Sequence, residues 1–322
     1  MSCLHLRRLT VEFSTPLGDL RAVDEVSLDH EGGETLALIG ETGCGKSVVA
    51  HAILGLLPDN AAVRGSVELG GRDLLAMSER ELAAVRGAQI GIVLQNPSQA
   101  LNPIHRIGRQ IGEPLVVHRG LRPRAARPRV HAALHRLGFL DVERHLEAYP
   151  FQFSGGMNQR VLIAASLVLE PRILIADEPT KGLDAGLRTL VREEMGTIKR
   201  LNGSSLLLIT HDLELARGIA DRVAVMYGGQ IIEVAAAERF FAGPAHPYAR
   251  ALLESLPENG FRPIAGPTLD MTAPPSGCRF HPRCPAAGEA CARRQPELYP
   301  ADTGPRSSGP RSSGLVRCLL YC

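Results

Sequence analysis

Short apolar runs alternate with amphipathic stretches along the chain, a pattern that predicts strands and helices in alternation. The runs that suit strands lie at residues 9–14, 26–40, 66–76, 90–95, 172–177, 205–212 and 222–233. Short buried strands that alternate with helices favour a three-layer domain with a largely parallel sheet. We therefore predict an α/β fold for most of the chain.

Between about residues 97 and 160 the pattern becomes helical and rich in arginine, which predicts an inserted helical subdomain. Pro114, Pro123 and Pro128 are expected to interrupt its helices. The basic stretch 122–136 has no acidic residue and could touch phospholipid head groups or an acidic partner. A solvated helix face explains it more simply, and its two prolines argue against one continuous amphipathic membrane helix.

The composition changes after about residue 241, where Pro, Gly, Arg and Cys dominate. The tandem repeat GPRSSGPRSSG at residues 304–314 predicts a flexible linker. We therefore place a domain boundary near residue 240. Residues 1–240 form the main domain, and residues 241–322 form a C-terminal extension.

The charge balance and the start of the chain exclude several classes of protein. The 36 Lys and Arg against 34 Asp and Glu leave a net charge of +2, which gives no general reason to expect nucleic-acid binding. No apolar run approaches the roughly 18 to 20 residues that span a bilayer, and the start lacks the apolar stretch of a signal peptide. We expect a cytosolic protein that is neither integral to the membrane nor secreted, with membrane association left open.

Residues 40–47, GETGCGKS, match the pattern G-x-x-x-x-G-K-[ST] in full, between a predicted strand and a predicted helix. Glycines in such a loop let backbone N–H groups wrap a polyphosphate, and the helix N-terminus adds a favourable dipole. Lys46 can reach the β- and γ-phosphates, and Ser47 can ligate Mg²⁺. We predict an ATP-type site formed by Gly40, Glu41, Thr42, Gly43, Cys44, Gly45, Lys46, Ser47 and Val48.

The segment RILIADEP places Asp177 and Glu178 at the end of a predicted buried strand. A carboxylate there can hold Mg²⁺ opposite Ser47, and the adjacent Glu178 can polarise an attacking water. The same pair could instead cap a helix. We favour Asp177 as the Mg²⁺ partner and Glu178 as the catalytic base.

The segment FSGGMNQR, residues 153–160, precedes an apolar helical stretch, so Ser154, Gly155 and Gly156 form a helix N-cap with exposed N–H donors. Physical reasoning alone leaves open whether this is only a capped helix start. Together with the phosphate loop, DEPTKGLD and LLITHD, the segment resembles the signature of ATP-binding cassette (ABC) ATPases. The resemblance covers nearly the whole chain.

The resemblance to ABC ATPases implies roles for further residues. Gln95 is similar to the glutamine that senses Mg²⁺, and His211 to the switch histidine that contacts the γ-phosphate. Asp184 occupies the position of the D-loop aspartate at the dimer interface, and Phe13 is a candidate for the aromatic residue that stacks on adenine. Lys181, in KGLDA, departs from the family pattern. Because it does not replace a phosphate ligand, we expect this departure to alter the tuning of ATP hydrolysis and not to abolish catalysis.

In ABC ATPases two cassettes pair head to tail, and each ATP lies between one phosphate loop and the partner's SGG segment. The resemblance implies that two sets of residues act on different nucleotides: Lys46, Ser47, Gln95, Asp177, Glu178 and His211 on one, and Ser154, Gly155, Gly156 and Gln159 on the other. Mg²⁺ would be held through Ser47, Gln95 and Asp177. Catalysis would be electrostatic positioning of the γ-phosphate, Mg²⁺ and water.

Two segments resemble the ATPases of oligopeptide, dipeptide and nickel importers: residues 96–114, which in that family pack against a membrane subunit, and the tail with HPYARALLESLP and CRFHPRCPAAGEAC. This implies the ATP-hydrolysing subunit of a bacterial peptide importer, peripheral at the cytoplasmic face of the inner membrane. Its implied partners are a second homologous ATPase or a copy of itself, two permeases and an extracytoplasmic solute-binding protein. The alternatives are a nickel or metal-chelate importer, and a non-transport ABC subunit of a soluble enzyme assembly.

Five of the seven cysteines lie in the tail. Cys278, Cys284 and Cys291 are separated by five and six residues, and Cys318 follows the repeat. Zinc sites more often contain C-x₂₋₄-C pairs, whereas four thiolates can hold a [4Fe–4S] cluster, an arrangement that some peptide-importer ATPases resemble. We favour the cluster, with zinc and unliganded thiols as alternatives.

Overall fold

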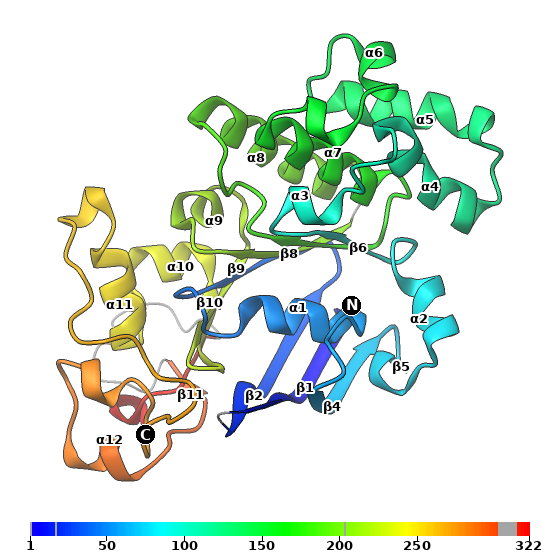
Figure 1. Ribbon diagram of the computed structural model, residues 1–322. Coiled ribbons are helices and arrows are strands. Elements are labelled where there is room, and N and C mark those ends of the chain that lie inside the picture. Colours follow the sequence, from blue (N-terminus) through cyan, green and yellow to red (C-terminus); the bar gives the residue numbers. More distant parts are fainter. Residues whose placement is uncertain (1, 17, 203, 302–313) are drawn as a thin grey trace. The chain divides into compact units, whose positions relative to one another are not determined.

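The computed structural model describes residues 2–16, 18–202, 204–301 and 314–322, which form two compact units (Figure 1). Unit 1 comprises Met1–His30, Leu36–Leu75 and Ala220–Cys322, and unit 2 comprises Glu31–Thr35 and Ala76–Ile219. The repeat at residues 304–314, predicted to be a linker, lies outside the described residues except for Gly314.

A four-stranded sheet of unit 1 contains β1 (Ser2–Thr15), β2 (Gly18–Glu31), β4 (Ala61–Leu69) and β5 (Arg72–Asp73) in the order β2-β1-β4-β5. β4 pairs antiparallel with β1 and with β5. Alternate residues of β2, such as Val26, Leu28 and His30, are buried, as expected for a sheet with one face on the core. The hydrophobic pattern predicted these strands, but it did not predict a separate antiparallel sheet.

The other strands of unit 1 follow the order β11-β12-β10-β9-β3. β3 (Thr35–Ile39) pairs parallel with β9 (Arg222–Tyr227), which turns through Gly228 and Gly229, both with positive φ, into the antiparallel β10 (Gln230–Ala236). The tail adds β12 (Leu315–Val316) and β11 (Tyr299–Pro300) beyond β10. Part of the C-terminal extension therefore continues a sheet of the main domain.

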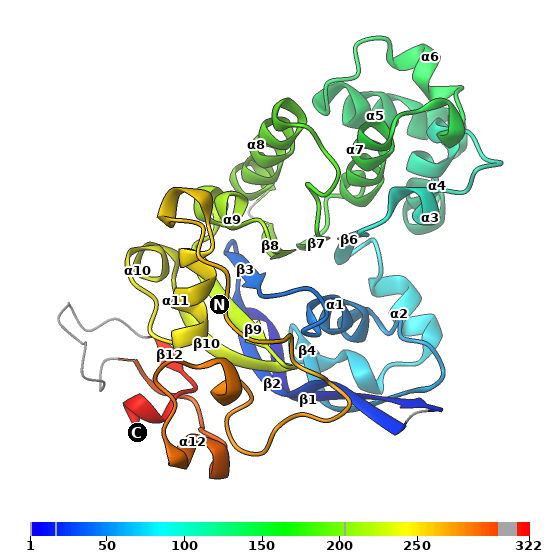
Figure 2. The same ribbon diagram turned by 60° about the vertical axis from the view of Figure 1, so that its left-hand side comes forward.

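The helices of unit 1 are α1 (Lys46–Leu54), α10 (Ala237–Ala242), α11 (Pro247–Glu254) and α12 (Glu289–Arg293). Figure 2 shows α10 and α11 near β10, and α10 contacts both β9 and β10. The described tail has a small apolar core of its own, formed by Ala245, Ala301, Val316, Cys318 and Tyr321. Burial of these side chains ties the two ends of the extension together.

The strands of unit 2 are β6 (Ile90–Val93), β7 (Ile173–Asp177) and β8 (Ser205–Thr210), and β7 pairs parallel with both β6 and β8. Every residue of β7 and β8 is buried, as expected for parallel strands covered on both faces. Helices α8 (Ala185–Asn202) and α9 (Leu213–Ile219) pack against β8, and α2 (Glu79–Val85) begins with a capping box. The predicted α/β fold is confirmed.

The predicted helical subdomain corresponds to α3 (Pro97–Ala100), α4 (Ile107–Arg119), α5 (Pro123–Arg136), α6 (Val142–Leu146) and α7 (Gly155–Leu167). Helix α4 contacts α5, α6 and α7, so these helices form one packed group. No helix of the described residues has both the length and the apolar character needed to cross a bilayer.

The expected interruptions at Pro114 and Pro128 are wrong, because α4 and α5 continue through these prolines. Pro123, in contrast, starts α5, where its missing N–H costs nothing. An internal proline removes one helical hydrogen bond, at a cost of about 3 kcal/mol. Burial of Leu115 beside Pro114, and of Val130 near Pro128, offsets this cost. The prolines therefore give no argument against a continuous helix between residues 123 and 136.

Candidate nucleotide-binding and hydrolysis site

The phosphate loop of unit 1 connects β3 to α1, as the sequence pattern predicted. The N-terminal N–H groups of α1 have no partners within the helix, so they are available to an anion. Gly43 has a φ of +83°, and a Cβ added there would meet no atom within 4 Å, so this side of the loop is open. The loop has the donors and the space that a polyphosphate needs.

Two glycines of the loop lie where no side chain fits. A Cβ on Gly40 would lie 2.2 Å from the carbonyl oxygen of Met226, and a Cβ on Gly45 would lie 2.3 Å from that of Ala22. Gly45 also has a φ of +106° at the N-cap of α1. Backbone from β2 and β9 thus approaches the loop closely, and only glycine permits this approach.

Lys46 is buried, and its Nζ donates to the carbonyl oxygens of Gly40 at 2.8 Å and Glu41 at 2.9 Å. The ammonium group is therefore held over the loop, where the γ-phosphate of a bound nucleotide would need a positive charge. Its neighbour Cys44 is also buried, and desolvation raises the pKa of that thiol. Cys44 therefore stays protonated and contributes no negative charge to the loop.

Ser47 and Val48 lie in the first turn of α1, and Thr42 is exposed at the tip of the loop. Phe13, the candidate for stacking on adenine, lies on β1 opposite Ala61 and is half-buried. All of these residues belong to unit 1. The stacking role of Phe13 stays a prediction.

The candidate hydrolytic residues of unit 2 meet at the ends of β7 and β8. Asp177 is the last residue of β7 and is buried. The carboxylate of Glu178 accepts the backbone N–H of His211 at 3.1 Å, and the Nδ1 of the same histidine lies 2.8 Å from Glu178 Oε1. Thr210 Oγ1 donates to Glu178 Oε2 at 3.3 Å. The structure thus brings together the predicted base and the predicted switch histidine.

Glu178 has a φ of +51°, a left-handed conformation that residues other than glycine rarely adopt. Such a conformation costs about 1–3 kcal/mol and is characteristic of functional sites. Its carboxylate is 8% exposed, whereas the His211 side chain is 58% exposed. The acid is therefore fixed, and the histidine can be reached from solvent.

Three further predicted residues also belong to unit 2. Gln95 follows β6 and is exposed, and Asp184 precedes α8, where its Oδ1 accepts the N–H of Leu187 at 2.9 Å. Lys181 is exposed and donates its backbone N–H to the carbonyl oxygen of Glu178. No described contact joins Gln95 to Asp177, so their joint role in holding Mg²⁺ stays a prediction.

The segment that resembles the ABC signature starts α7. Ser154 is exposed at the N-cap and its Oγ accepts the N–H of Met157 at 3.3 Å, as predicted for a capped helix start. Gly155 is open, whereas a Cβ on Gly156 would lie 2.8 Å from Leu187 Cδ1. Gln159 is 1% exposed, and its role at the partner's nucleotide stays a prediction.

The four tail cysteines of the predicted cluster, Cys278, Cys284, Cys291 and Cys318, all line one cavity of about 20 Å³ in unit 1. Burial raises the pKa of Cys278 to about 11 and also raises the pKa values of Cys284 and Cys318, with a further increase from the neighbouring thiols. Across the described part of the chain, no three His, Cys, Asp or Glu side chains are grouped to hold a metal ion. The donors suit a metal cluster, but the cavity has room for roughly one water.

Sequence reasoning did not identify two side chains that contact the phosphate loop. The Tyr248 hydroxyl accepts the N–H of Glu41 at 2.9 Å, and the Arg283 guanidinium binds the Glu41 carboxylate. Both lie in segments that the sequence analysis noted only as a tail resemblance. No local pattern could show that these residues contact a loop more than 200 positions earlier.

Comparisons with known proteins agree with this geometry. The ABC transporter family model matches residues 23–181, and the model of the oligopeptide/dipeptide transporter C-terminal region matches residues 232–291. The chain is 43% identical to the dipeptide transport ATP-binding protein DppD of Bacillus subtilis, over 93% of this chain and 90% of that protein. It is 38% identical to the oligopeptide transport ATP-binding protein OppD of Salmonella typhimurium, over 91% and 89%.

Solved structures show the same fold. A dimeric post-hydrolysis ATP-binding cassette, MJ0796 with ADP and phosphate bound, matches with a TM-score of 0.67 and 26% identity, over 73% of this chain and 98% of that one. The cbiO1 protein of Clostridium perfringens matches with a TM-score of 0.62, over 80% and 95%. The fold is that of an ABC ATPase. The chain belongs to the ABC transporter family, among the ATP-binding proteins that carry the C-terminal region of oligopeptide/dipeptide transporters.

Proposed function

We propose that the chain is the ATP-hydrolysing subunit of a peptide importer, peripheral at the cytoplasmic face of the membrane. One observation carries the proposal: a complete phosphate loop and the C-terminal region of oligopeptide/dipeptide transporters occur in the same chain. The names of the most similar relatives, which are dipeptide and oligopeptide transport proteins, support peptides as the cargo. We retain residues 1–240 as the ATPase domain and residues 241–322 as the extension.

The proposed mechanism assigns binding and hydrolysis to different residues. Lys46 and the N–H groups of the phosphate loop hold the β- and γ-phosphates, with adenine stacked on Phe13. Ser47, Gln95 and Asp177 would hold Mg²⁺, which would neutralise phosphate charge. Glu178 orients the attacking water and accepts its proton, and His211 keeps the carboxylate in place while its ring faces the γ-phosphate.

We propose a dimer of cassettes, with a homologous ATPase or a second copy of the chain. Ser154, Gly155 and Gly156 would then bind the nucleotide held by the partner, and Asp184 would lie at the interface. The exposed N-cap of α7 supports this role, because its N–H donors point out of the helix end.

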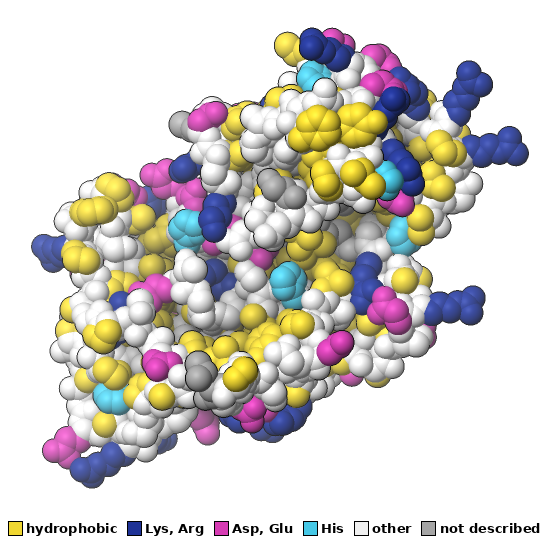
Figure 3. Space-filling view, viewed as in Figure 1, with side chains coloured by type: hydrophobic (Ala, Val, Ile, Leu, Met, Phe, Trp, Pro, Cys, Tyr) yellow, Lys and Arg dark blue, Asp and Glu magenta, His cyan; other side chains and the backbone are white. Residues whose placement is uncertain are grey.

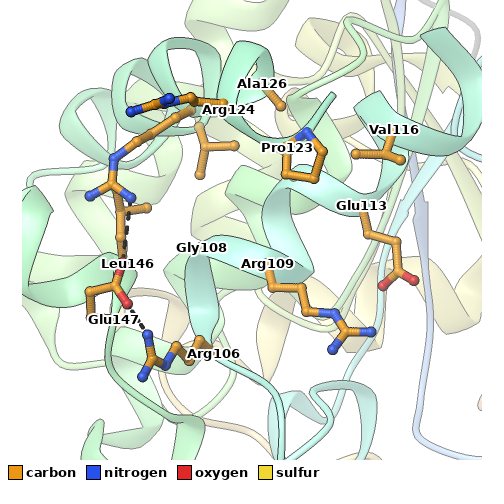
Figure 4. Close-up of a pocket in the computed structure, with 13 residues that line it drawn as sticks. Arg106, Gly108, Arg109, Glu113, Val116, Pro123, Arg124, Ala126, Leu146 and Glu147 are labelled. Carbon is orange, nitrogen blue, oxygen red and sulfur yellow. Dashed lines mark hydrogen bonds and ion pairs between the residues drawn. The ribbon is translucent and has the colours of Figure 1, made fainter. Parts of the chain in front are cut away.

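A cavity of about 780 Å³ among α4, α5 and α6 supports a contact with a membrane subunit (Figure 4). Apolar side chains and glycines line it, together with Arg106, Arg109, Arg124, Arg127, Glu113 and Glu147. Glu147 already pairs with Arg106 and Arg127. Four arginines against two glutamates leave a positive surface, which suits a permease segment with acidic and apolar side chains.

Unit 2 also has exposed apolar side chains outside the cavity lining. Ile104, Val117, Leu140 and Phe151 are between 69% and 94% exposed. Figure 3 shows hydrophobic side chains at the surface over the helices of unit 2. Exposed apolar groups that gather on a surface are characteristic of protein interaction sites. A partner protein that covers these four side chains would bury apolar surface that is exposed in unit 2 alone.

Copurification from detergent extracts tests the proposed function. We expect two permease subunits and a second ATPase to accompany the full-length protein. The variants Arg109→Glu and Arg124→Glu should reduce the amount of permease recovered, while the isolated chain still binds MgATP. Recovery of a soluble multi-enzyme assembly in place of permeases would contradict the proposal, and a nickel-specific binding protein encoded with the permeases would favour the metal-chelate alternative.

We further propose that the four tail thiolates hold a [4Fe–4S] cluster with a structural or redox-sensing role. Their position around one cavity supports the proposal, although that cavity must widen to admit a cluster. Anaerobically purified protein should then contain about four irons per chain and absorb broadly in the visible range. Iron-free protein that still hydrolyses ATP would contradict the cluster and leave zinc or unliganded thiols, without affecting the ATPase assignment.

A further inference from the structure

The tail segment 278–284 contacts the phosphate loop directly within unit 1. Arg283 Nη1 donates to Glu41 Oε2 at 3.0 Å, and Arg283 Nη2 donates to Glu41 Oε1 at 3.1 Å. The guanidinium side chain is only 6% exposed and the carboxylate is 25% exposed. A bidentate arginine–carboxylate pair consists of charge-assisted hydrogen bonds, which are stronger than neutral ones, and it fixes geometry as well as distance.

The backbone of Glu41 is held from two further sides. Its N–H donates to the hydroxyl of Tyr248, on α11, at 2.9 Å, and its carbonyl oxygen accepts Lys46 Nζ at 2.9 Å. Glu41 therefore connects the tail, helix α11 and the lysine that binds the nucleotide. A movement of Glu41 would displace the carbonyl oxygen that positions the ammonium group of Lys46.

An aromatic cluster fixes the side of the loop that faces the tail. The Tyr227 ring lies 4.6 Å from Tyr248 and 5.3 Å from Phe280, and Tyr248 lies 5.4 Å from Phe280. Phe280 and Tyr248 are fully buried. Arg283 also donates to the Tyr227 hydroxyl at 3.4 Å. Because these rings come from β9, α11 and the tail, they hold the three elements in one arrangement around Glu41.

A second arginine of the segment holds the turn between β9 and β10, which contacts the loop. Arg279 donates to Asp24 Oδ2 at 2.6 Å and to the carbonyl oxygen of Gly228. The next residue, Gly229, donates its N–H to the carbonyl oxygen of Cys44 at 3.0 Å. Arg283 thus contacts the loop directly at Glu41, whereas Arg279 holds the neighbouring turn, whose Gly229 contacts the loop at Cys44.

We propose that residues 278–284 brace the phosphate loop, and that Arg283 is a positioning residue for nucleotide binding. With the brace in place, the loop is preorganised and a nucleotide does not have to order it on binding. Without the pair, the side chain of Glu41 is free to rotate, the backbone of Glu41 is still held by Tyr248 and Lys46, and nucleotide binding must restore the order of the loop. The expected loss of MgATP affinity is about 10-fold, the effect of removing one charged hydrogen-bonded contact.

The brace also gives the cysteines of the tail a route to the nucleotide. Cys278 and Cys284 flank the two arginines, and the N–H of Cys278 donates to the carbonyl oxygen of Cys291 at 2.8 Å. A change at these thiols that shifts the segment shifts the contacts of Arg283 as well. By linkage, nucleotide binding then alters the state of the thiols to the same extent. The coupling between the thiols and the nucleotide rests on the proposed function. The positioning role of Arg283 does not require that the tail cysteines hold a metal.

The test compares full-length Arg283→Gln, Arg283→Lys, Glu41→Gln and the double variant Glu41→Gln/Arg283→Gln. The Kd of a fluorescent ATP analogue with Mg²⁺, and the KM and kcat for MgATP, are measured. Arg283→Gln and Glu41→Gln should each raise Kd and KM about 10-fold with little change in kcat, and the double variant should be no weaker than either. Arg283→Lys should bind MgATP more tightly than Arg283→Gln but less tightly than the wild type. An ammonium group keeps the positive charge but lacks the two parallel N–H donors of the guanidinium.

Arg293→Gln is the matched control, because this tail arginine is 80% exposed and pairs only with Glu289 among described contacts. It should bind MgATP as the wild type does. Wild-type affinity in Arg283→Gln, a lowered kcat with unchanged KM, or additive losses in the double variant would each overturn the proposal. If Arg283→Gln fails to fold, Glu41→Gln removes the same contact from the loop side. Binding by the wild type itself tests the ATPase assignment separately.

Discussion

The phosphate loop of unit 1 and the candidate hydrolytic residues of unit 2 are held in different ways. In unit 1 the phosphate loop is enclosed by buried contacts: backbone of β2 and β9, the Tyr248 hydroxyl, and the Arg283 ion pair. In unit 2 the acid Glu178 is held by the end of the neighbouring strand, and its partner His211 is largely exposed. Under the proposed roles, nucleotide binding depends on the braced loop of unit 1, and hydrolysis depends on Glu178, in its left-handed conformation, beside the exposed His211.

The variant Glu178→Gln tests the hydrolytic residues of unit 2 and has the largest expected effect, which is on kcat. The amide keeps the shape of the side chain but cannot accept a proton, so kcat should fall by about 10²–10⁴-fold. Affinity for MgATP should not change, because the phosphate loop is intact. Steady-state kinetics and equilibrium binding measure both quantities, and size-exclusion chromatography with ATP should detect a stabilised dimer. Turnover at the wild-type rate would contradict the base assignment.

Lys46→Ala should show the opposite behaviour, because it removes the buried ammonium of the braced loop. Loss of a charged hydrogen-bonding group should weaken MgATP binding by about 10- to 150-fold. Arg80→Ala, a surface change on α2, is the control and should bind normally. If Lys46→Ala binds MgATP like the wild type and loses only turnover, the assignment of nucleotide binding to the phosphate loop is wrong.

Unit 1, which contains the braced phosphate loop, should also affect how the free energy of unfolding depends on pH. Glu233 accepts the N–H groups of Ala245 and His246, at the start of the helix that carries Tyr248. Burial raises the pKa of Glu233 from 4.5 to about 7 and lowers the pKa of His246 from 6.5 to about 3. Between about pH 4.5 and 6.5, unfolding therefore releases a proton from Glu233 and adds one to His246, so the two effects on stability cancel.

Glu233→Gln removes one of these opposing contributions. Only His246 then takes up a proton on unfolding, so the free energy of unfolding should rise with pH across this window. Relative to the wild type, the slope should increase by about 1.4 kcal/mol per pH unit. Urea denaturation at several pH values measures it. Parallel pH profiles for the two proteins would show that Glu233 is not protonated in the folded state.

Ser154→Ala has the smallest expected effect and tests the unit 2 side. Loss of the N-cap hydrogen bond to Met157 should lower the free energy of unfolding by about 1 kcal/mol. Ser154→Asp, which can also cap the helix, should restore stability but place a negative charge where we propose that the partner's nucleotide binds. ATP-dependent dimerisation would then be weaker in the stable variant. Equal dimerisation by wild type and Ser154→Asp would contradict the partner-site role.

The sequence alone was sufficient to predict the features that depend on residues close together in the chain. Glycine spacing located the phosphate loop between β3 and α1, and an apolar run ending in Asp177 located the carboxylates. The proximity of Glu178 and His211 follows from parallel pairing of two strands that end at the same edge. These inferences need only periodicity, glycine geometry and the rules of sheet topology.

Features that depend on tertiary packing were missed. Pro128 does not end its helix, because burial of Ala126 and Val130 outweighs the lost hydrogen bond. Contact between Glu41 and Arg283 joins positions 242 residues apart, and no local pattern encodes such a pairing. Spacing suggested a cluster of tail cysteines, but only the fold shows that all four line one cavity.

The most direct test of the central claim is the ATPase rate of the complete transporter in lipid vesicles, with its binding protein supplied on the opposite side. We predict that a peptide-loaded binding protein stimulates ATP hydrolysis and that Glu178→Gln abolishes this stimulation. Stimulation by a nickel chelate and not by peptides would contradict the peptide assignment. Hydrolysis that responds to neither, in a chain that binds no permease, would contradict the importer account as a whole.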